Sequence, residues 1–335
     1  MTKRINSIDI LRFIAAFAVV CIHTSYFAKE YALPIMRFAV PVFFAVSGYF
    51  YCSADVFKKK SQIKHILFLS VFSVLFYFCV QLVTAAFSGD INSFFVQTFT
   101  FDNLWRFAVF NYVPDKLGDH LWFLFALLYC MIFDLLISKF KINSTVFKIL
   151  ITLFLVVNII IGSYSKVLFG VWPPIEIARS FIFTGLPFFY IGRFLRQVPK
   201  ISVPNPALII FIFVFAVTSV LEYFLLKSIG ASASKEMYIS TVFLAVTILC
   251  FVIKNPLNNP RKSLVRICKY GRKYSLMIYI IHPMIIKILN PVVGHMGNAV
   301  QNLYSFTSPI IMFIGALIFA MIFNYLINRL KAVRQ

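Results

Sequence analysis

Long apolar segments alternate with short polar breaks along the whole chain. Cutting the sequence at these breaks leaves about ten segments of roughly 17–24 residues, and each is long enough to cross a bilayer as a helix. Barrel strands of about ten residues with alternating polarity do not describe such continuous runs. We therefore predict an all-α integral membrane protein, a bundle of about ten transmembrane helices. The expected spans lie near residues 8–27, 35–52, 64–87, 120–138, 146–163, 178–195, 206–226, 236–253, 273–289 and 305–328.

Composition supports this prediction. The 335 residues are 61% hydrophobic and 13% charged, whereas an ordinary soluble domain has about 25% charged residues. With a cytoplasmic N-terminus, most Lys and Arg fall at the inner ends of the spans and most Asp and Glu at the outer ends, so the positive-inside rule predicts a cell-membrane protein with both termini cytoplasmic. The net charge of +21 suits anionic membrane lipids and a phosphorylated cytoplasmic ligand, and we expect no nucleic-acid partner.

The chain is expected to form one membrane domain, residues 1–335, with no soluble domain. Its first span follows a short basic start without a small-residue cleavage site, so we expect a retained anchor. The sequence contains no repeat and no Walker loop, HExxH or GxSxG motif. The six Cys have no paired spacing, which favours buried thiols over disulfides or metal ligands. We therefore predict neither a metal site nor a bound cofactor.

The first span carries the ionisable residues Asp9, Arg12 and His23. Such side chains are costly inside a membrane, so they indicate a functional site. Arg12 and His23 are separated by almost three helical turns, which places them on one helix face about 16 Å apart along the axis. Asp9 lies one turn before Arg12 and can pair with it. The alternative is an arginine that snorkels to the membrane surface and a histidine bonded to a neighbouring helix.

The second span contains the sequence RFAVPVFFAVSGYF, residues 37–50. Pro41 can kink the helix, and Ser47 and Gly48 allow another backbone to approach closely. Because a short external loop over residues 28–34 joins the first two spans, we expect this small-residue face to pack on the first helix, with Ser47 as a candidate substrate contact. Helix packing alone is the alternative explanation.

Basic residues gather in two stretches that are expected in the cytoplasm. Three consecutive lysines, residues 58–60, lie within the stretch 53–65, and the stretch 254–273 is the most basic part of the chain. A solvated charge run is the simpler expectation for the lysines, and a site for nucleotide phosphates is the alternative.

The longest polar interval, residues 88–119, is expected outside the membrane and mixes charged with aromatic residues. We predict an ordered loop that covers an extracytoplasmic acceptor, because loops of this length in compact proteins are often functional. His120 and Trp122 follow at the outer interface, where an aromatic-belt Trp and a surface His are the alternative. Glu176 and Arg179 lie one turn apart at the outer start of the sixth span and can form an ion pair that faces the bundle interior.

The ninth span contains YSLMIYIIHPMII, residues 274–286. His282 lies near its middle, and Pro283 frees a backbone carbonyl beside it. A polar site that lines a path through the bundle is one interpretation of His282, and a histidine bonded to neighbouring backbone is the other.

Together these features resemble acyltransferase family 3, the multi-pass membrane acyltransferases that modify surface polysaccharides and related acceptors. The resemblance rests on Asp9-x-x-Arg12, followed by ten residues and His23. It continues, in the family's order and over essentially the whole chain, through PVFFAVSGY (41–49), LWFL (121–124), LPFFYIG (186–192) and YSLMIYIIHP (274–283). Some members of this family carry an added soluble domain, such as a hydrolase-like domain or a racemase, and we expect this chain to be a membrane module alone.

The resemblance implies an O-acyltransferase, of the class that transfers groups other than aminoacyl groups. Its co-substrate would be cytoplasmic acyl-CoA, in particular acetyl-CoA. Its acceptor would be a hydroxyl of an extracytoplasmic glycan or glycolipid, with other surface-polysaccharide enzymes as partners. Arg12, supported by Asp9, would orient the donor, and His23 would act as general base or carry the acyl group. The remaining candidates are expected to contact substrate: Ser47, His120, Trp122, Glu176, Arg179 and His282.

Two other functions fit the same pattern. A transporter or flippase of a small polar molecule or glycan precursor also needs many spans, broken helices and intramembrane charge, although the sequence has no inverted repeat of broken segments. A structural subunit of a polysaccharide-export complex is the third. Turnover of acyl-CoA by the pure protein, and its loss in His23→Ala, would separate the enzyme from both.

Overall fold

The computed structural model describes residues 5–140, 143–231 and 237–333 of the chain. Every regular element in these ranges is helical, which confirms the predicted all-α class. Nine candidate membrane spans occur there, and the predicted eighth span corresponds to α13 (Ile239–Lys254), an apolar helix of 16 residues. Its predicted start at residue 236 and part of the basic turn 139–145 lie outside the described residues. The cytoplasmic position of both termini stays a prediction.

Contacts between helices divide the chain into two compact units. The first, which we call the terminal unit, comprises residues 1–43, 200–223 and 239–335 and so holds both ends of the chain. The second, the central unit, comprises residues 44–199 and 224–238. Two helices contribute residues to both units, α3 (Ala39–Tyr51) and α12 (Asn205–Ser228).

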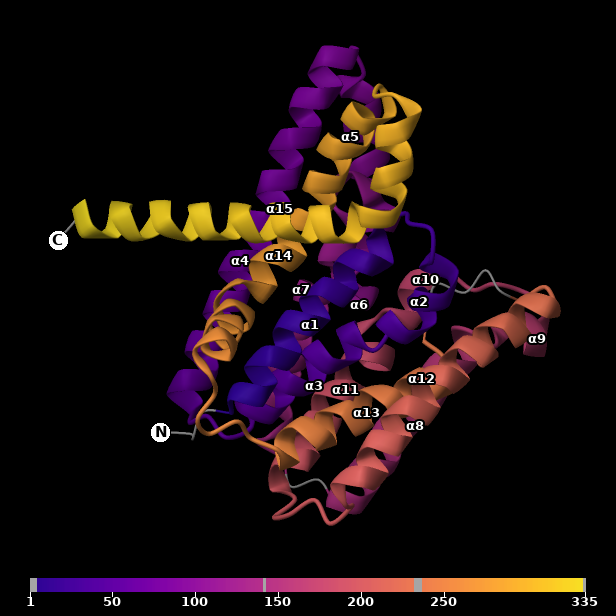
Figure 1. Ribbon diagram of the computed structural model, residues 1–335, viewed down its shortest axis with the longest axis vertical. Helices are drawn as coiled ribbons and strands as arrows, with labels where there is room; N and C mark the ends of the chain where they lie inside the picture. Colours follow the sequence, from indigo (N-terminus) through magenta and orange to yellow (C-terminus); the bar gives the residue numbers. More distant parts are fainter. Residues whose placement is uncertain (1–4, 141–142, 232–236, 334–335) are drawn as a thin grey trace. The chain divides into compact units, whose positions relative to one another are not determined.

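The terminal unit is built on two helices that lie side by side, α1 (Asn6–His23) and α14 (Lys262–Gly294). Theirs is the most extensive helix contact among the described residues (Figure 1). The two backbones can approach because residue 271 of α14 is glycine: a Cβ there would lie 1.9 Å from the carbonyl oxygen of Asp9. Small residues permit such close packing of helices in membranes.

The prediction of a loop over residues 28–34 is wrong, because most of this segment forms a helix, α2 (Lys29–Met36), which packs on α1. Its external position stays a prediction. A helix of eight residues is too short to be stable by itself. Its tertiary contacts therefore decide its structure, and local sequence does not reveal them. After a turn at Arg37 and Phe38 the chain enters α3, with Pro41 in the first turn of that helix, where proline is tolerated.

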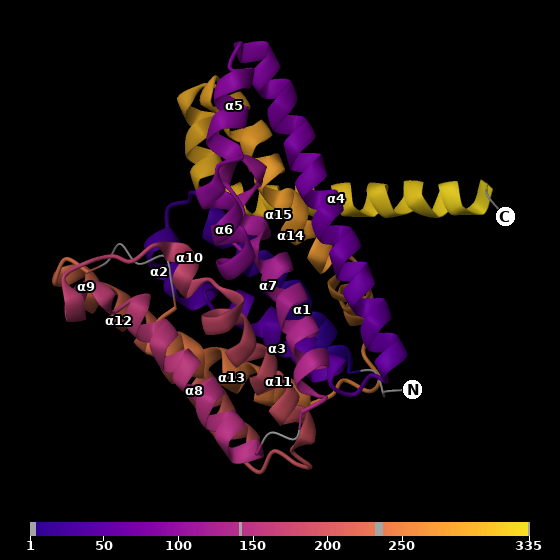
Figure 2. The ribbon, with the colours of Figure 1, turned by 180° about the vertical axis from the view of Figure 1, so that it is seen from behind.

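The last helix of the terminal unit, α15 (Asn298–Val333), turns sharply along its length (Figures 1 and 2). Pro309 lies inside it and has no backbone N–H, so the carbonyl of Ser305 loses its helical donor. That carbonyl instead accepts the backbone N–H of Phe27 at 2.9 Å. One residue before the proline, Ser308 donates its hydroxyl to the carbonyl of Ser25 at 2.7 Å. The bend is thereby bonded to the segment that follows α1.

Long helices of the central unit are α4 (Val56–Ser88), α7 (Trp122–Ile137), α8 (Ser144–Ile161) and α11 (Leu186–Gln197). The interval 88–119 is ordered, as predicted, but it is largely helical: it holds α5 (Ile91–Thr98), α6 (Phe101–Phe110) and a 3₁₀ turn, Asp115–Leu117. A second 3₁₀ turn, Asp119–Leu121, leads into α7. Before α11 come α9 (Ser165–Phe169), α10 (Ile175–Ala178) and a π-helical turn, η3 (Phe181–Gly185).

Helices α3 and α11 interlock through two glycines. A Cβ at Gly48 would lie 1.8 Å from the carbonyl oxygen of Phe189, and a Cβ at Gly192 would lie 1.7 Å from that of Ala45. The small-residue face was predicted to pack on the first helix, but at Gly48 its neighbour is α11. The glycines that end PVFFAVSGY and LPFFYIG in the sequence therefore have a reciprocal packing role.

A buried ion cluster joins α4, α7 and α11. Asp134 of α7 is fully buried, and its carboxylate pairs with Lys59 Nζ at 2.9 Å and with the guanidinium of Arg193. The hydroxyl of Tyr190 donates to the same carboxylate at 3.2 Å. The prediction of a solvated run at residues 58–60 is thus wrong for Lys59, because its partner lies in an apolar span far along the sequence.

Candidate active site

At the start of α1, the acidic and basic residues pair as predicted. Asp9 is 4% exposed, and its Oδ1 lies 3.5 Å from Nη1 of Arg12. Arg272 of α14 lies close enough to Arg12 to interact with it electrostatically. An acidic side chain in the first helical turn also interacts favourably with the helix dipole. The foot of α1 therefore presents a guanidinium that is held on one side by a carboxylate.

At the other end of α1, His23 is exposed and is the last residue of the helix. The helix stops there because Thr24 has extended backbone, with its hydroxyl bonded to the carbonyl of Val20 at 3.0 Å. The imidazole of His23 lies beside that of His282 on α14, with 5.0 Å between the ring centroids. The close contact of α1 with α14 thus brings together two histidines that are far apart in sequence.

His282 is fully buried, and its ring is fixed by backbone. Pro283 deprives the carbonyl of Tyr279 of its helical donor, and Nδ1 of His282 lies 2.8 Å from that carbonyl oxygen and 3.3 Å from the one of Ile278. Of the two interpretations of His282, the bond to neighbouring backbone is the one that the structure shows. Because a carbonyl only accepts, Nδ1 must carry the hydrogen, and in a neutral imidazole the lone pair is then on Nε2.

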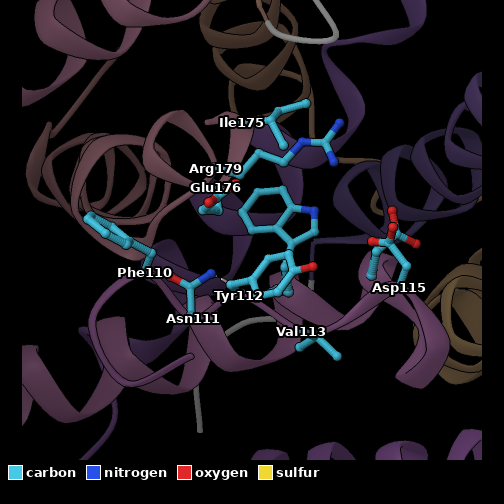
Figure 3. Close-up of a pocket in the computed structure, with 10 residues that line it drawn as sticks. Phe110, Asn111, Tyr112, Val113, Asp115, Ile175, Glu176 and Arg179 are labelled. Atoms are coloured by element: carbon cyan, nitrogen blue, oxygen red, sulfur yellow. Dashed lines mark hydrogen bonds between the residues drawn. The ribbon is translucent and has the colours of Figure 1, made fainter. Parts of the chain in front are cut away.

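In the central unit, a second group of predicted residues surrounds a small cavity of about 50 Å³. Trp122, Glu176 and Arg179 all line it, so the structure brings these three predicted residues together. Figure 3 labels Glu176 and Arg179 in the wall. The rest of the wall mixes aromatic, aliphatic, amide and acidic side chains: Phe110, Asn111, Tyr112, Val113, Asp115, Asp119 and Ile175.

Asn111 builds the wall of this cavity. It ends α6 in the left-handed conformation with φ of 52°, which asparagine tolerates better than most residues. Its Oδ1 accepts the backbone N–H of Phe181 at 2.6 Å, and its amide nitrogen donates to the carbonyl of Trp122 at 3.4 Å. One side chain therefore ties the end of α6 to the π-helical turn and to α7.

An ion pair that was not predicted fixes Glu176. The guanidinium of Arg106, on α6, bonds to the Glu176 carboxylate and also reaches Asp102 at 3.2 Å. The same guanidinium lies over the ring of Tyr112, 4.2 Å from its centroid. Burial and the negative charge of Asp115 raise the pKa of Tyr112 above its ordinary value, so its hydroxyl stays protonated at neutral pH. The sequence signal for Arg106 was its place in the polar interval 88–119.

Two predicted contact residues lie elsewhere. His120 is 3% exposed and packs edge-on against the ring of Tyr77, with 5.1 Å between centroids. Its position contradicts the surface-histidine alternative, and it does not belong to the described lining of the cavity. Ser47 is half-buried on α3, next to the glycine that packs on α11.

Three comparisons with known proteins concern the chain as a whole. An amino-acid racemase of Enterococcus faecalis is 23% identical over 365 aligned residues, which take in 100% of this chain and 48% of the racemase, so the chain spans about half the length of this relative. No solved structure matches the chain. The family model described as an acyltransferase domain matches residues 5–329. Because that match covers nearly the whole of a chain with many apolar helices, the protein is a multi-pass membrane protein that belongs to acyltransferase family 3.

Proposed function

We propose that the protein is an O-acyltransferase that moves an acyl group, in particular acetyl, from cytoplasmic acyl-CoA to a hydroxyl of an extracytoplasmic cell-surface glycan. Membership of the family supports acyl transfer in general. The observation that carries the proposal is the exposed imidazole of His23 at the end of α1, beside the buried imidazole of His282. A neutral imidazole is suited to accept a proton near pH 7.

In the proposed reaction, His23 takes the proton of the acceptor hydroxyl as its oxygen attacks the thioester carbonyl. The new C–O bond forms, the C–S bond breaks, and the CoA thiolate leaves and recovers the proton from the imidazolium. His23 as a transient acyl carrier is the other route. Arg12, held by Asp9, orients the donor near the start of α1.

For the acceptor, we propose the cavity of the central unit as a recognition site for sugar hydroxyls. Aromatic faces, carboxylates and a guanidinium are present together in its wall. Carboxylates accept hydrogen bonds from hydroxyls, and a guanidinium donates to them. The rings of Tyr112 and Trp122 supply apolar surface for the face of a sugar.

The test is release of free CoA from acetyl-CoA by detergent-purified protein, with cell-wall glycan as acceptor. Wild type is compared with His23→Ala and Arg12→Ala, and with His295→Ala as a matched control, because His295 is also exposed and directly follows the last residue of a helix. We expect CoA release to fall by about 10²- to 10⁴-fold in His23→Ala, to fall in Arg12→Ala through weaker donor binding, and to be unchanged in the control. A folded wild type that neither binds nor turns over acetyl-CoA would overturn the proposal.

A second candidate is favoured by the relative. The name of the E. faecalis protein is amino-acid racemase, so an amino acid is the alternative small molecule, either as an acyl acceptor or as cargo of a transporter. Flux of a labelled amino acid into proteoliposomes without acetyl-CoA would support transport. Consumption of acetyl-CoA only when an amino acid is present would support it as the acceptor.

A further inference from the structure

The proposed reaction assigns a role to His23 of the histidine pair in the terminal unit but none to its neighbour, His282. His23 is exposed at the end of α1, whereas His282 is fully buried on α14. We propose that His282 is a positioning residue for His23: its Nε2 lone pair accepts an N–H of His23 and leaves the other nitrogen of His23 as the base. This inference rests on the proposed function for its reaction, and on the geometry of the pair for its structural part.

The ring of His282 is well suited to hold another side chain, because it is itself held. Its Nδ1–H bonds to the carbonyl that Pro283 frees at Tyr279, 2.8 Å away. Burial removes the solvent that would otherwise compete for this bond. A tautomer fixed in this way presents its lone pair at Nε2 in a set direction.

The separation of the rings fits the proposed bond. With centroids 5.0 Å apart, a turn of the exposed His23 ring can bring one of its nitrogens within hydrogen-bonding distance of Nε2 of His282, about 3 Å. An exposed histidine at a helix end otherwise has several rotamers, and ordering it costs conformational entropy at each turnover. A bond to a fixed neighbour removes that cost before substrate arrives.

The chemical consequence follows the pattern of a base oriented by a third group. When His23 takes the acceptor proton, its imidazolium has two N–H groups: one carries the transferred proton, and the other stays bonded to Nε2 of His282. The bond becomes stronger in that state because its donor is charged. After the C–S bond breaks, the transferred proton goes to the CoA thiolate and the pair returns to its initial state.

A purely structural role for His282, in which it only satisfies the carbonyl of Tyr279, predicts different behaviour of two variants. In His282→Asn, the side-chain amide keeps a donor near the position of Nδ1 but lacks Nε2. In His282→Phe, both are lost. If the role is structural, His282→Asn behaves like the wild type. If His282 positions His23, His282→Asn folds but has an altered His23.

The experiment uses full-length purified protein and three measurements: thermal unfolding, the rate at which diethyl pyrocarbonate modifies His23 (followed by peptide mass spectrometry), and kcat and KM for CoA release. We expect His282→Asn to unfold near the wild-type temperature. In this variant diethyl pyrocarbonate should modify His23 several-fold more slowly than in the wild type, and kcat should be lower by about ten- to a hundredfold with little change in KM. His282→Phe should also lose thermal stability.

If the His23 modification rate and kcat of His282→Asn both equal the wild-type values, the proposal is overturned and His282 has a structural role only. His295→Asn is the matched control and should change neither quantity. If the wild type neither binds acetyl-CoA nor releases CoA, the proposed function fails, but the modification rate of His23 in His282→Asn still decides whether the two histidines are coupled.

Discussion

Two buried polar residues, Asp134 of the central unit and His282 of the terminal unit, are held in different ways. Both carboxylate oxygens of Asp134 are engaged: Lys59 bonds to Oδ2, and Arg193 and Tyr190 bond to Oδ1. Its partners come from three helices, so the cluster connects α4, α7 and α11.

The ring of His282 is bonded to its own helix and lies beside a histidine that is exposed. A charge surrounded by bonding partners holds helices together, whereas a fixed ring beside an exposed one can take part in proton transfer. Both residues are buried, but under the proposed function only His282 serves the reaction, because only His282 lies beside an exposed side chain.

The largest effect on stability is expected from removing the centre of the ion cluster. Asp134→Ala leaves Lys59 and Arg193 without their buried carboxylate and should lower the free energy of unfolding by about 3–5 kcal/mol. Thermal unfolding in detergent measures this change. The double variant Asp134→Leu with Lys59→Met should recover part of the loss, because the buried one of the two cations is then gone. A stable Asp134→Ala would contradict the structural role assigned to the cluster.

The next effect concerns the glycine contacts. Gly192→Ala places a Cβ 1.7 Å from the carbonyl oxygen of Ala45, so α3 and α11 must separate, at a cost of about 1–3 kcal/mol. Gly294→Ala is the matched control, since a Cβ there meets no described atom within 4 Å. A large drop in unfolding temperature is expected for the first variant only. Equal unfolding temperatures for the two variants would argue against the interlock.

A smaller effect, on the KM for glycan, tests whether the cavity of the central unit recognises the acceptor while His23 performs the chemistry. Trp122→Ala removes aromatic surface from the cavity wall and should raise the KM for glycan about tenfold, which corresponds to 1.4 kcal/mol of binding, with kcat little changed. Trp105→Ala is the control, because Trp105 is exposed and not part of the described lining. Steady-state kinetics with varied glycan checks this. An unchanged KM would place acceptor recognition outside this cavity.

The smallest expected effect is a pH dependence at the start of α4. The Asp55 carboxylate accepts the backbone N–H of Lys58 and pairs with its ammonium, both at 2.8 Å, and these bonds lower the pKa of Asp55 below its ordinary value. Its contribution to stability is therefore present above the ordinary pKa of about 4 and is lost as the pH falls below it. Unfolding temperatures of wild type and Asp55→Asn should differ slightly at pH 7 and converge at low pH. If the difference in unfolding temperature between wild type and Asp55→Asn grows as the pH falls, this prediction is contradicted.

Features that depend on neighbouring residues were predictable from sequence. The apolar runs predicted the spans, and the spacing of Asp9 and Arg12 predicted their pairing. The proline after His282 made a bond to backbone one of the two interpretations of that residue, and the structure shows this bond. In each case the interacting groups are within one or two helical turns. Local geometry is therefore sufficient to predict them.

Features that depend on which helices meet could not be predicted. The ring contact of His23 with His282 and the burial of Lys59 against Asp134 join segments far apart in sequence. Arg106 finds Glu176 for the same reason. The sequence of a charge run does not reveal whether one of its residues pairs with a residue of an apolar span, and the sequence of the span does not reveal it either. The short helices of the interval 88–119 are likewise decided by packing, because isolated helices of this length are marginal in water.

The bend of α15 has a consequence for the stage of synthesis at which the surroundings of His23 are completed. The segment just after His23 is bonded to Ser305 and Ser308, which are near the C-terminus, and the ring beside His23 belongs to α14. A ribosome releases the first helix into the membrane long before it has synthesised either partner. The surroundings of His23 are therefore completed only when the end of the chain emerges, so a truncated product that inserts its early helices would lack a finished site.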